Sequence, residues 1–499
     1  MTAVTGRTRI GLEIAAAGLA GGLVGDTLLR AMPWGLNVAV GTTALLAAGA
    51  LLIRRSRITP GPDAAWLAVT ALLLGVAFVR RDAAPLAQFD MLALIAALAF
   101  AAASVQGERI MQWSLVDYVR AGVTATAASI GGVLLLITRD IDWRATPGEG
   151  KSRLRQARAA LAGVLIAVPL LAIFAALFAS ADRVFANVLE NIFDFDAVRI
   201  VQHTFFICFW GALTAGLLRW GLIARPIAAP KMEYIPTSPT PFAVALGLLD
   251  ALFLLFVVVQ LRYFFGGATL VEQTGGLTYA EYARSGFFEL ATASALVLPV
   301  LLALDHLTRG GTPPQIRTVR QLTGLLLVLL AFVMASALER MRLYVDAYGL
   351  SATRLYATAF MVFLVGVFVW FAWTVLRGNR ARFAFGALMQ GLAVLAGLHV
   401  LNPDAFIVRT NLHRPDAVVP FDAAYAASLG ADAVPALLDA MPRLDQNDRC
   451  EVASRLLRRW SAPADWRTWN WSRAKAHRLV SERAADLHAT CPAGKGVAP

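Results

Sequence analysis

Apolar stretches of helix length follow one another along most of the chain, and the short loops between them contain most of its arginines. A hydrocarbon core about 30 Å thick needs roughly 20 apolar residues for each helical crossing. Transmembrane β-strands would show alternation over about ten residues, a pattern that we do not find. The sequence therefore predicts an all-α, polytopic transmembrane bundle of about eleven or twelve crossings. The stretches cover residues 10–30, 34–53, 64–79, 85–103, 118–137, 159–179, 201–222, 241–261, 285–304, 320–338, 355–376 and 383–401.

The pattern changes near Asn402-Pro403-Asp404. Beyond this point the helix-length apolar runs stop, and Arg, Asp, Pro and Trp become frequent up to the end of the chain. The change indicates a passage from lipid to water and a small α-helical polar domain. Three regions are expected: an N-terminal transmembrane region over 1–158, a second transmembrane region over 159–401 and the polar C-terminal domain over 402–499.

Short amphipathic helices are expected in the polar domain around 421–425 and 431–438, and a longer one over Cys450–Trp460. The longer helix is amphipathic. Its apolar face contains Val452, Leu456 and Leu457, and its basic face contains Arg455, Arg458 and Arg459. Cys450 and Cys491 form a disulfide if the domain lies in an oxidising compartment, and free thiols otherwise. An aromatic and basic cluster contains Trp466, Trp469, Trp471, Arg473 and Lys475. It is interpreted either as a binding surface for lipid head groups or a partner, or as a packed cluster.

Composition agrees with the membrane assignment. Hydrophobic residues make up 58% of the chain and charged residues 16%, whereas a soluble chain has about 45–50% and 25%. The net charge of +12 would suggest nucleic acid in a soluble protein. Here the arginines occupy short loops, where basic residues set topology. We therefore expect membrane lipids as partners and no nucleic acid.

Arginine counts predict which loops are cytoplasmic. In the second half, one set of loops is denser in basic residues: 139–158, 219–231, 309–320 and 377–382. Arg7, Arg9 and the loop 54–57 also look cytoplasmic, which gives the wrong parity if every stretch crosses. If 64–79 is re-entrant or merely buried, parity is restored with eleven crossings or so and an extracytoplasmic C-terminal domain. The alternative has about twelve crossings with both termini on one side.

The first apolar stretch contains Glu13 and Asp26, so we expect a retained helix rather than a cleaved leader. Small residues let helices approach closely in lipid. The first stretch therefore predicts close packing against a neighbour through Gly18, Gly21, Gly22 and Gly25.

Charged groups in mid-membrane are costly and usually face a bundle interior or water. Asp250 is the deepest of them, between Leu249 and a run of apolar residues. It predicts either a proton or ion relay or substrate contact, or a helix–helix hydrogen bond. The same alternatives apply to Glu13, Asp26, His203 and Glu289.

Two polar, tyrosine-rich loops are expected on one face of the membrane. The first contains Glu281 and Arg284, and it is interpreted as a ligand-facing loop or an interfacial anchor. The second places Glu339, Arg342 and Asp346 at i, i+3 and i+7 on one helix face, where the arginine can pair with either carboxylate. It is interpreted as a ligand-holding hairpin or a charge-satisfied hinge. A site contiguous with these loops would add Asn402, Asp404, Asn411 and His413 from just beyond the break; otherwise these four cap and turn the chain.

The segments 279–290, 339–356 and 402–405 resemble the bacterial membrane family called domain of unknown function four-one-seven-three. The similarity covers residues 160–440 or so. The resemblance implies a multi-pass protein of the bacterial inner membrane. The family has no agreed activity or catalytic residues, so the resemblance supplies no mechanism.

No P-loop, HExxH, GxSxG or clustered metal spacing occurs, and no cofactor or metal is expected. Three functions remain open. The first is transport or lipid handling through a polar intramembrane cavity, and the second is a non-catalytic envelope regulator or scaffold that binds a partner through its outer loops and C-terminal domain. The third, which is less favoured, is an intramembrane enzyme that uses Glu281 or Glu339 as an acid or base.

Overall fold

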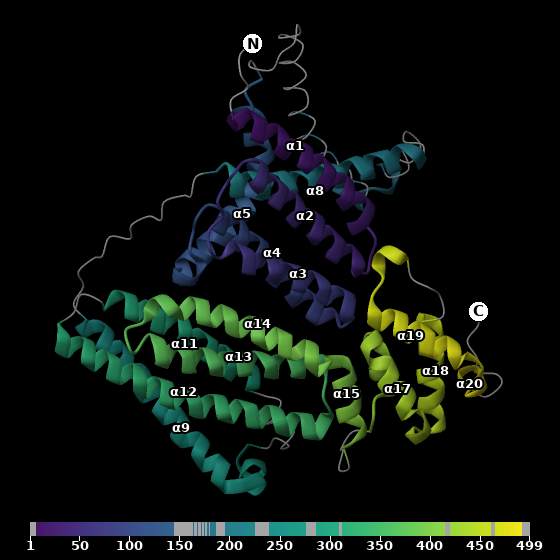
Figure 1. Ribbon diagram of the computed structural model, residues 1–499. Coiled ribbons are helices and arrows are strands. Elements are labelled where there is room, and N and C mark those ends of the chain that lie inside the picture. The colour runs from purple at the N-terminus through teal and green to yellow at the C-terminus, as the bar shows by residue number, and fades with distance from the viewer. Residues whose placement is uncertain are drawn as a thin grey trace. The chain divides into compact units, whose positions relative to one another are not determined.

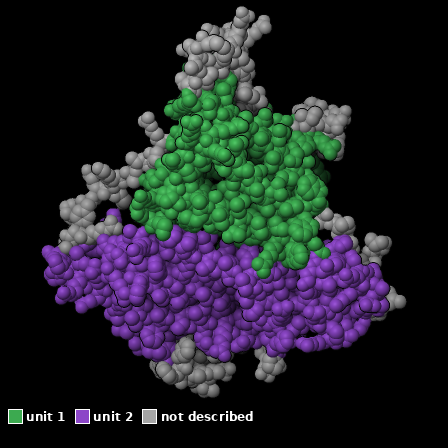
Figure 2. All heavy atoms as spheres, viewed as in Figure 1, with its two compact units in different colours: residues 1–80, 87–228, 464–474 green, residues 81–86, 229–463, 475–499 purple. Residues whose placement is uncertain are grey.

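The computed structural model describes residues 6–143, scattered positions between 163 and 185, and 195–224, 239–275, 286–308, 312–414, 420–460 and 465–491. This part of the chain is helical and contains no strand, which confirms the all-α prediction (Figure 1). It divides into two compact units, shown in Figure 2. Unit 1 comprises Met1–Arg80, Ala87–Ala228 and Ala464–Ala474, and unit 2 comprises Arg81–Leu86, Ala229–Pro463 and Lys475–Pro499.

Ten of the described helices are long and apolar enough to cross a membrane, and a shorter apolar one, Ala64–Arg80, accompanies them. The chain is therefore a multi-pass membrane protein with a helical bundle, as expected. The helices that begin in unit 1 are α1 (Gly6–Val24) with the π-helical turn η1 (Gly25–Leu29), α2 (Leu36–Arg55), α3 (Ala64–Arg80), η2 (Ile110–Gln112), α5 (Leu115–Leu135) with η3 (Leu136–Asp140), α8 (Phe195–Leu222), η7 (Trp466–Thr468) and α19 (Trp471–Glu482). The others are α4 (Ala84–Val105), α9 (Thr240–Gly275), α11 (Phe287–Leu307), α12 (Pro313–Tyr348), α13 (Ala352–Thr374), η4 (Arg380–Arg382), α14 (Phe383–Leu401), α15 (Pro403–Leu412), α16 (Ala423–Ser428), η5 (Ala431–Ala433), α17 (Val434–Ala440), η6 (Met441–Arg443), α18 (Gln446–Trp460) and α20 (Ala484–Ala489).

In unit 1, the glycines of α1 form its contact with α8. A Cβ atom built on Gly18 would lie 2.7 Å from the Cβ of Ala215, and one on Gly22 would meet the Ile207 carbonyl oxygen. Gly25 lies equally close to the Trp210 side chain. The predicted close packing of the first helix is thus confirmed, and larger side chains at these positions would force α1 and α8 apart.

The helix α3 runs antiparallel to α2. Gly75, near the end of α3, contacts Ala39 near the start of α2. The residues 465–473, which we call the strap, contact the same end of the pair: Leu36 N–H donates to the Trp469 carbonyl oxygen over 2.8 Å. Arg57 and Arg80 therefore flank α3 at opposite ends of α2. Ala64–Arg80 is one continuous helix and is shorter than the ten candidate spans, so the interpretation of 64–79 as re-entrant or merely buried stays a prediction.

Both flanks of α5 connect to the end of unit 1 that lies opposite the strap. Arg9 donates to the Arg55 carbonyl oxygen, so the start of α1 and the end of α2 share this end. Asp140 is 2.7 Å from Arg7. At the other flank of α5, Met111 N–H donates to Asp63 in the α2–α3 loop over 3.4 Å.

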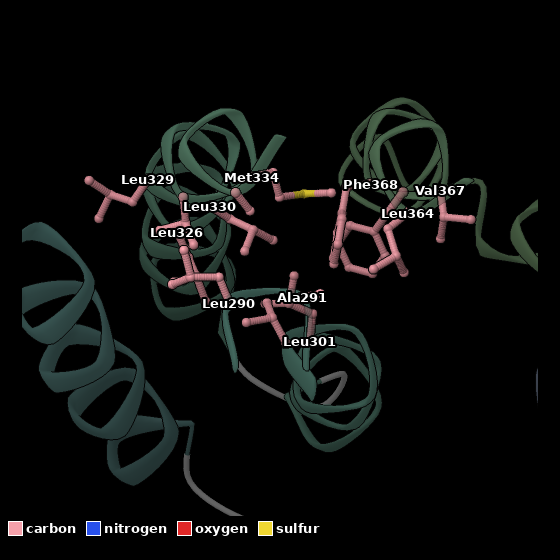
Figure 3. Packing of buried hydrophobic residues seen from close by; sticks show 14 of the residues in the cluster. Leu290, Ala291, Leu301, Leu326, Leu329, Leu330, Met334, Leu364, Val367 and Phe368 are labelled. Carbon is pink, nitrogen blue, oxygen red and sulfur yellow. The ribbon is translucent and has the colours of Figure 1, made fainter. Parts of the chain in front are cut away.

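The core of unit 2 is formed by α9, α11, α12 and α13. Figure 3 shows Met334 of α12 pointing toward Phe368 of α13, above Ala291 and Leu301 of α11. Leu326 and Leu330 complete the α12 face and are almost inaccessible to solvent. Lipid tails are as apolar as these side chains, so the close fit of side chains stabilises this core more than removal from water does.

The C-terminal part of unit 2 has its own hydrophobic cluster, drawn from α15 to α20. The expected helices are present, since 421–425 falls at α16, 431–438 falls at η5 and α17, and 450–460 falls within α18. In α18, Val452 and Leu456 are buried whereas Arg458 and Arg459 are exposed, as predicted. Cys450 and Cys491 form a disulfide.

Candidate functional site

Asp250 lies on the face of α9 that packs into the core of unit 2. Leu246, Phe253 and Val257 occupy the same face at i−4, i+3 and i+7 and belong to that core. The residue is only 4% exposed, and neither carboxylate oxygen has a hydrogen-bond partner. An unpaired carboxyl group in an apolar, membrane-embedded setting is costly, and such residues commonly bind or transfer something.

A second polar group lies between α9 and α12. The Gln260 side-chain oxygen accepts hydrogen bonds from Arg340 Nη2 at 3.1 Å and from Ser336 Oγ at 3.4 Å. Arg340 is buried, and its guanidinium approaches the backbone at Gly286, where a Cβ atom would lie 2.5 Å from Nη1. Gly286 has a φ of 89°, in the left-handed region that favours glycine. The position immediately before α11 therefore needs a glycine for two reasons.

The sequence-based predictions do not include Arg340 among the candidate site residues. The available signal was periodicity: Val333, Ser336, Ala337 and Arg340 recur at helical spacing on the buried face of α12. Glu339, Arg342 and Asp346 fall on the other side of the helix.

The predicted charged face of α12 is present but exposed. Arg342 Nη1 is 3.8 Å from Glu339, and its Nε is 3.9 Å from Asp346. The Arg342 side chain is 74% exposed, so each pair contributes about 0–1 kcal/mol. Glu289 is also exposed. Glu281 and Arg284 lie outside the described residues.

The hairpin between α12 and α13 is fastened to α15 and α16. Leu350 exchanges two hydrogen bonds with the Asn411 side chain, at 2.6 and 2.8 Å. Ala352 N–H donates to the Tyr425 hydroxyl over 2.8 Å. Gly349 adopts a φ of 84° and lies against Asn411. The expected proximity of this loop to polar residues beyond the break therefore holds for Asn411.

Arg354 stabilises the same hairpin, because its guanidinium lies over the Tyr344 ring at 3.9 Å from the centroid. Arg414 donates to the backbone carbonyl oxygens of Asp346 and Ala347. These bonds satisfy carbonyl groups that the last turn of α12 leaves open. The hairpin thus has the features of a charge-satisfied structural element.

At the break, Asn402 has a φ of 59° and separates α14 from α15. Asp404 follows in the first turn of α15 and is 3% exposed. Its Oδ2 accepts the N–H of Gly430 at 2.8 Å. Burial raises the pKa of Asp404 to about 6; the hydrogen bond from Gly430 opposes this, and the negative charges of Asp432 and Asp82 add to it.

Two further carboxylates and an arginine surround Gly430 and complete this group, which we call the junction. Arg81 Nη1 is 3.0 Å from Asp432 Oδ1, and the other oxygen of Asp432 accepts Asp82 N–H at 2.7 Å. Asp82 in turn accepts the N–H of Ala431 at 3.1 Å. Arg81 also donates to the His399 carbonyl oxygen at the end of α14.

The junction could not be found from the sequence, because Asp82 and Asp432 are separated by hundreds of residues. Among the described residues, no three His, Cys, Asp or Glu side chains are grouped so as to hold a metal ion. The hydrogen bonds of the junction attach the C-terminal part of unit 2 to the start of α4 and the end of α14.

In unit 1 the buried acids are paired. His203 Nδ1 is 2.6 Å from Asp26, and Arg30 lies 3.3 Å from the other ring nitrogen. Asp140 is buried between Arg7 and Arg219. For Asp26 and His203 the structure therefore supports a helix–helix hydrogen bond rather than a proton relay or a substrate contact.

The strap donates hydrogen bonds to carbonyl groups at the end of α3 and just before α2 in unit 1. The Asn470 side chain donates to the Phe78 carbonyl oxygen over 2.7 Å, and Ser472 Oγ donates to that of Arg80 over 2.9 Å. Arg473 is buried and donates to the Trp34 carbonyl oxygen. Trp466 and Trp471, by contrast, are largely exposed. The predicted aromatic and basic cluster is thus divided into a packed arginine and exposed indoles.

A family model described as Domain of unknown function (DUF4153) matches residues 68–440. No curated protein and no solved structure matches the chain. The match confirms a domain of unknown function, although the family is not the one named from the motifs. The matched residues include Asp250, Arg340 and the junction, whereas the strap and the arginines of α18 lie beyond them.

Proposed function

The chain belongs to the DUF4153 family, and from this premise we propose that it is a non-catalytic, multi-pass scaffold or regulator of the bacterial envelope. It resides in the inner membrane and holds its C-terminal domain at the outer face, where a protein partner binds. The observation that carries this proposal is the attachment of the polar tail to helix ends in both units.

In unit 1 the attachment uses the strap. Leu36 N–H at the start of α2 and the carbonyl groups of Phe78 and Arg80 at the end of α3 are all satisfied by strap residues. Helix ends leave such groups without intrahelical partners. A tail that supplies these partners is held in a defined position rather than tethered by a flexible linker.

In unit 2 the attachment uses the junction and the α12–α13 hairpin. Arg81 and Asp82 bind Asp432 and Ala431, and Asn411 and Tyr425 bind the hairpin. The bonded groups come from segments far apart in the sequence. A rigid display of the domain is what a scaffold requires, because less conformational entropy is then lost on binding a partner.

The orientation follows from charge. In unit 1 the strap lies at the end opposite Arg7, Arg9 and Arg55. In unit 2, Arg380 pairs with Asp305 at 2.8 Å, so the basic loops after α11 and α13 share an end, and the tail attaches at the other ends of α12 and α14. Basic loops face the cytoplasm, and the Cys450–Cys491 disulfide suits an oxidising compartment.

Thiol labelling tests the orientation directly. In a Cys208→Ser background, the disulfide leaves no free thiol among the three cysteines. A cysteine at exposed Arg458 should react with a membrane-impermeant maleimide on intact cells, and one at exposed Asn379 should react only after lysis. The reverse pattern would overturn the proposed orientation.

Complementation tests the scaffold. In cells that lack their own copy, a chain ending after Leu401 should reach the membrane in normal amount but fail to restore growth under envelope stress. The Asp250→Asn variant should restore it fully. Rescue by the truncated chain, or failure of Asp250→Asn at normal protein level, would contradict the proposal.

The second candidate function is proton- or cation-coupled transport, and it is favoured by one observation. Asp250 is buried with both carboxylate oxygens unpaired, as in a group that releases and binds a cation. A water-filled path to Asp250 is then required. In the Cys208→Ser background, a cysteine at position 247 should react with a small water-soluble thiol reagent, and failure to react would count against transport.

A further inference from the structure

The C-terminal domain contains a groove lined by three arginines. Arg455, Arg458 and Arg459 come from one face of α18, and Ala427 and Ser428 from the end of α16. The groove is shallow, has a volume of about 510 Å³ and is largely open to solvent. Its three arginines lie outside the family match, and none of the residues of the candidate site lines it.

Two of the three guanidinium groups are held in place. Arg459 Nη1 donates to the carbonyl oxygens of Ser428 and Leu429, at 2.9 and 2.7 Å. Arg455 donates to the Ala424 carbonyl oxygen over 2.9 Å and pairs with Glu451. These contacts occupy the carbonyl groups at the end of α16, which would otherwise repel an anion.

The positive charge of the groove is not cancelled. Carbonyl groups are neutral, so Arg459 keeps its full charge, and Glu451 neutralises only Arg455. Arg458 is exposed and has no hydrogen bond or ion pair within the described chain. Three guanidinium groups against Glu451, which pairs with Arg455, and Asp404, whose charge acts on Arg459, leave a net charge of at least +1 at the groove.

The chemistry of this arrangement selects phosphate. Planar guanidinium groups bind phosphate oxygens with pairs of parallel N–H donors, and such charge-assisted bonds are about twice as strong as neutral ones. Because Arg459 is already positioned by backbone carbonyls, only Arg458 of the two contacting side chains loses its conformational entropy on binding. A carboxylate alone would use fewer of the available donors.

We propose that this groove binds a phosphate group, supplied either by a phospholipid head group or by a free phosphate or phosphate ester in solution. The site goes beyond the scaffold function, since it binds its ligand whether or not the domain has a protein partner. Arg458 and Arg459 contact the phosphate, and Arg455 closes one side of the groove.

Binding is measured on the full chain in nanodiscs of phosphatidylcholine. Inorganic phosphate is titrated calorimetrically, first on the unaltered chain and then on Arg458→Gln and Arg459→Lys. The matched control is Arg483→Gln, which removes an exposed arginine of the same domain outside the groove. Each groove variant should weaken binding by about tenfold or more, and the control by less than about twofold.

A second arm distinguishes the sources. In the Cys208→Ser background, maleimide labelling of Ser428→Cys, an exposed position that lines the groove and leaves its three arginines in place, is compared between phosphatidylcholine nanodiscs and nanodiscs containing phosphatidylglycerol. Slower labelling with phosphatidylglycerol and no binding of inorganic phosphate assigns the site to lipid, and the converse assigns it to a soluble phosphate. Absence of both effects, or an equal loss in Arg483→Gln, would overturn the proposal.

Discussion

The buried carboxylates of the long apolar helices differ between the two units. In unit 1, Asp140 lies between Arg7 and Arg219, and Asp26 bonds to His203. In unit 2, Asp250 is buried to a similar degree but has no partner on either oxygen. The paired acids have an evident structural role at helix–helix contacts. Their positions in the sequence alone do not distinguish them from the unpaired Asp250. The difference singles out Asp250 as the group whose presence packing does not explain.

The largest expected effect is at Asp140. Removing one partner of a buried pair leaves an uncompensated charge and costs about 3–5 kcal/mol. Asp140→Asn should therefore lower the free energy of unfolding by that amount in a detergent-mixture titration. The control is Asp140→Asn combined with Arg219→Met, which removes both charges and should recover most of the loss. A single variant as stable as the parent would show that Asp140 is not structurally required.

The next effect concerns Asp404, which is buried in the C-terminal part of unit 2 and bonded to a backbone N–H. Its pKa in the folded chain is about 6, above the ordinary value of 3.8, so folding favours the protonated form. The stability that this proton contributes is present below pH 3.8 and is lost as pH rises through 6. At higher pH the buried charge costs roughly 3 kcal/mol, since one pKa unit corresponds to about 1.4 kcal/mol.

Asp404→Asn should remove this penalty. We expect the variant to resist thermal unfolding and proteolysis of the tail better than the parent at pH 8, and no better at pH 4. Asp422→Asn serves as a control, because that carboxylate caps α16 and belongs to a different group. A variant that is less stable than the parent at pH 8 would mean that the charge of Asp404 is needed at the junction.

A smaller effect is expected at Asp250. Because no hydrogen bond or ion pair is lost, Asp250→Asn should change the free energy of unfolding by less than about 1 kcal/mol. The same measurement as for Asp140 checks it, and the contrast between the two aspartates is the result of interest. A loss comparable with that at Asp140 would place Asp250 among the structural acids.

The smallest effect is at Arg342, whose two ion pairs are long and exposed. Arg342→Gln should lower stability by about 0.5 kcal/mol or less, and added salt should reduce even that difference. Arg340→Gln, two residues away on the buried face, serves as the comparison and should cost several times more. Equal losses would contradict the assignment of the two faces of α12.

Several features could be predicted from local sequence. The glycines of the first helix predicted its contact with a neighbour, because small side chains permit backbone approach whichever helix the partner is. The two faces of α18 followed from the spacing of Val452, Leu456 and the arginines. The burial of Asp250 followed from its apolar flanks. The identity of the partner helix, α8, did not follow from anything local.

The side of the membrane that each loop faces is also not a local property. Arginine counting predicts sides only when each apolar stretch is correctly assigned as a crossing or not, and length and flanking arginines favoured 64–79 as the exception. The structure places both flanks of α5 at one end of unit 1. Hydrophobicity measures affinity for lipid and carries no information on direction, so this assignment needs contacts between distant residues.

Hydrophobic periodicity and charge distribution along the chain were sufficient for the class of the protein, the end of the long apolar helices near Asn402 and the helical nature of the tail. These properties depend on each segment's own preference for lipid or water. The partners of Asp140, the attachment of the strap to α2 and α3, the junction around Gly430 and the arginine groove depend on which distant segments meet. Because each of these contacts joins segments far apart in the chain or side chains placed by packing, only the folded arrangement could establish them.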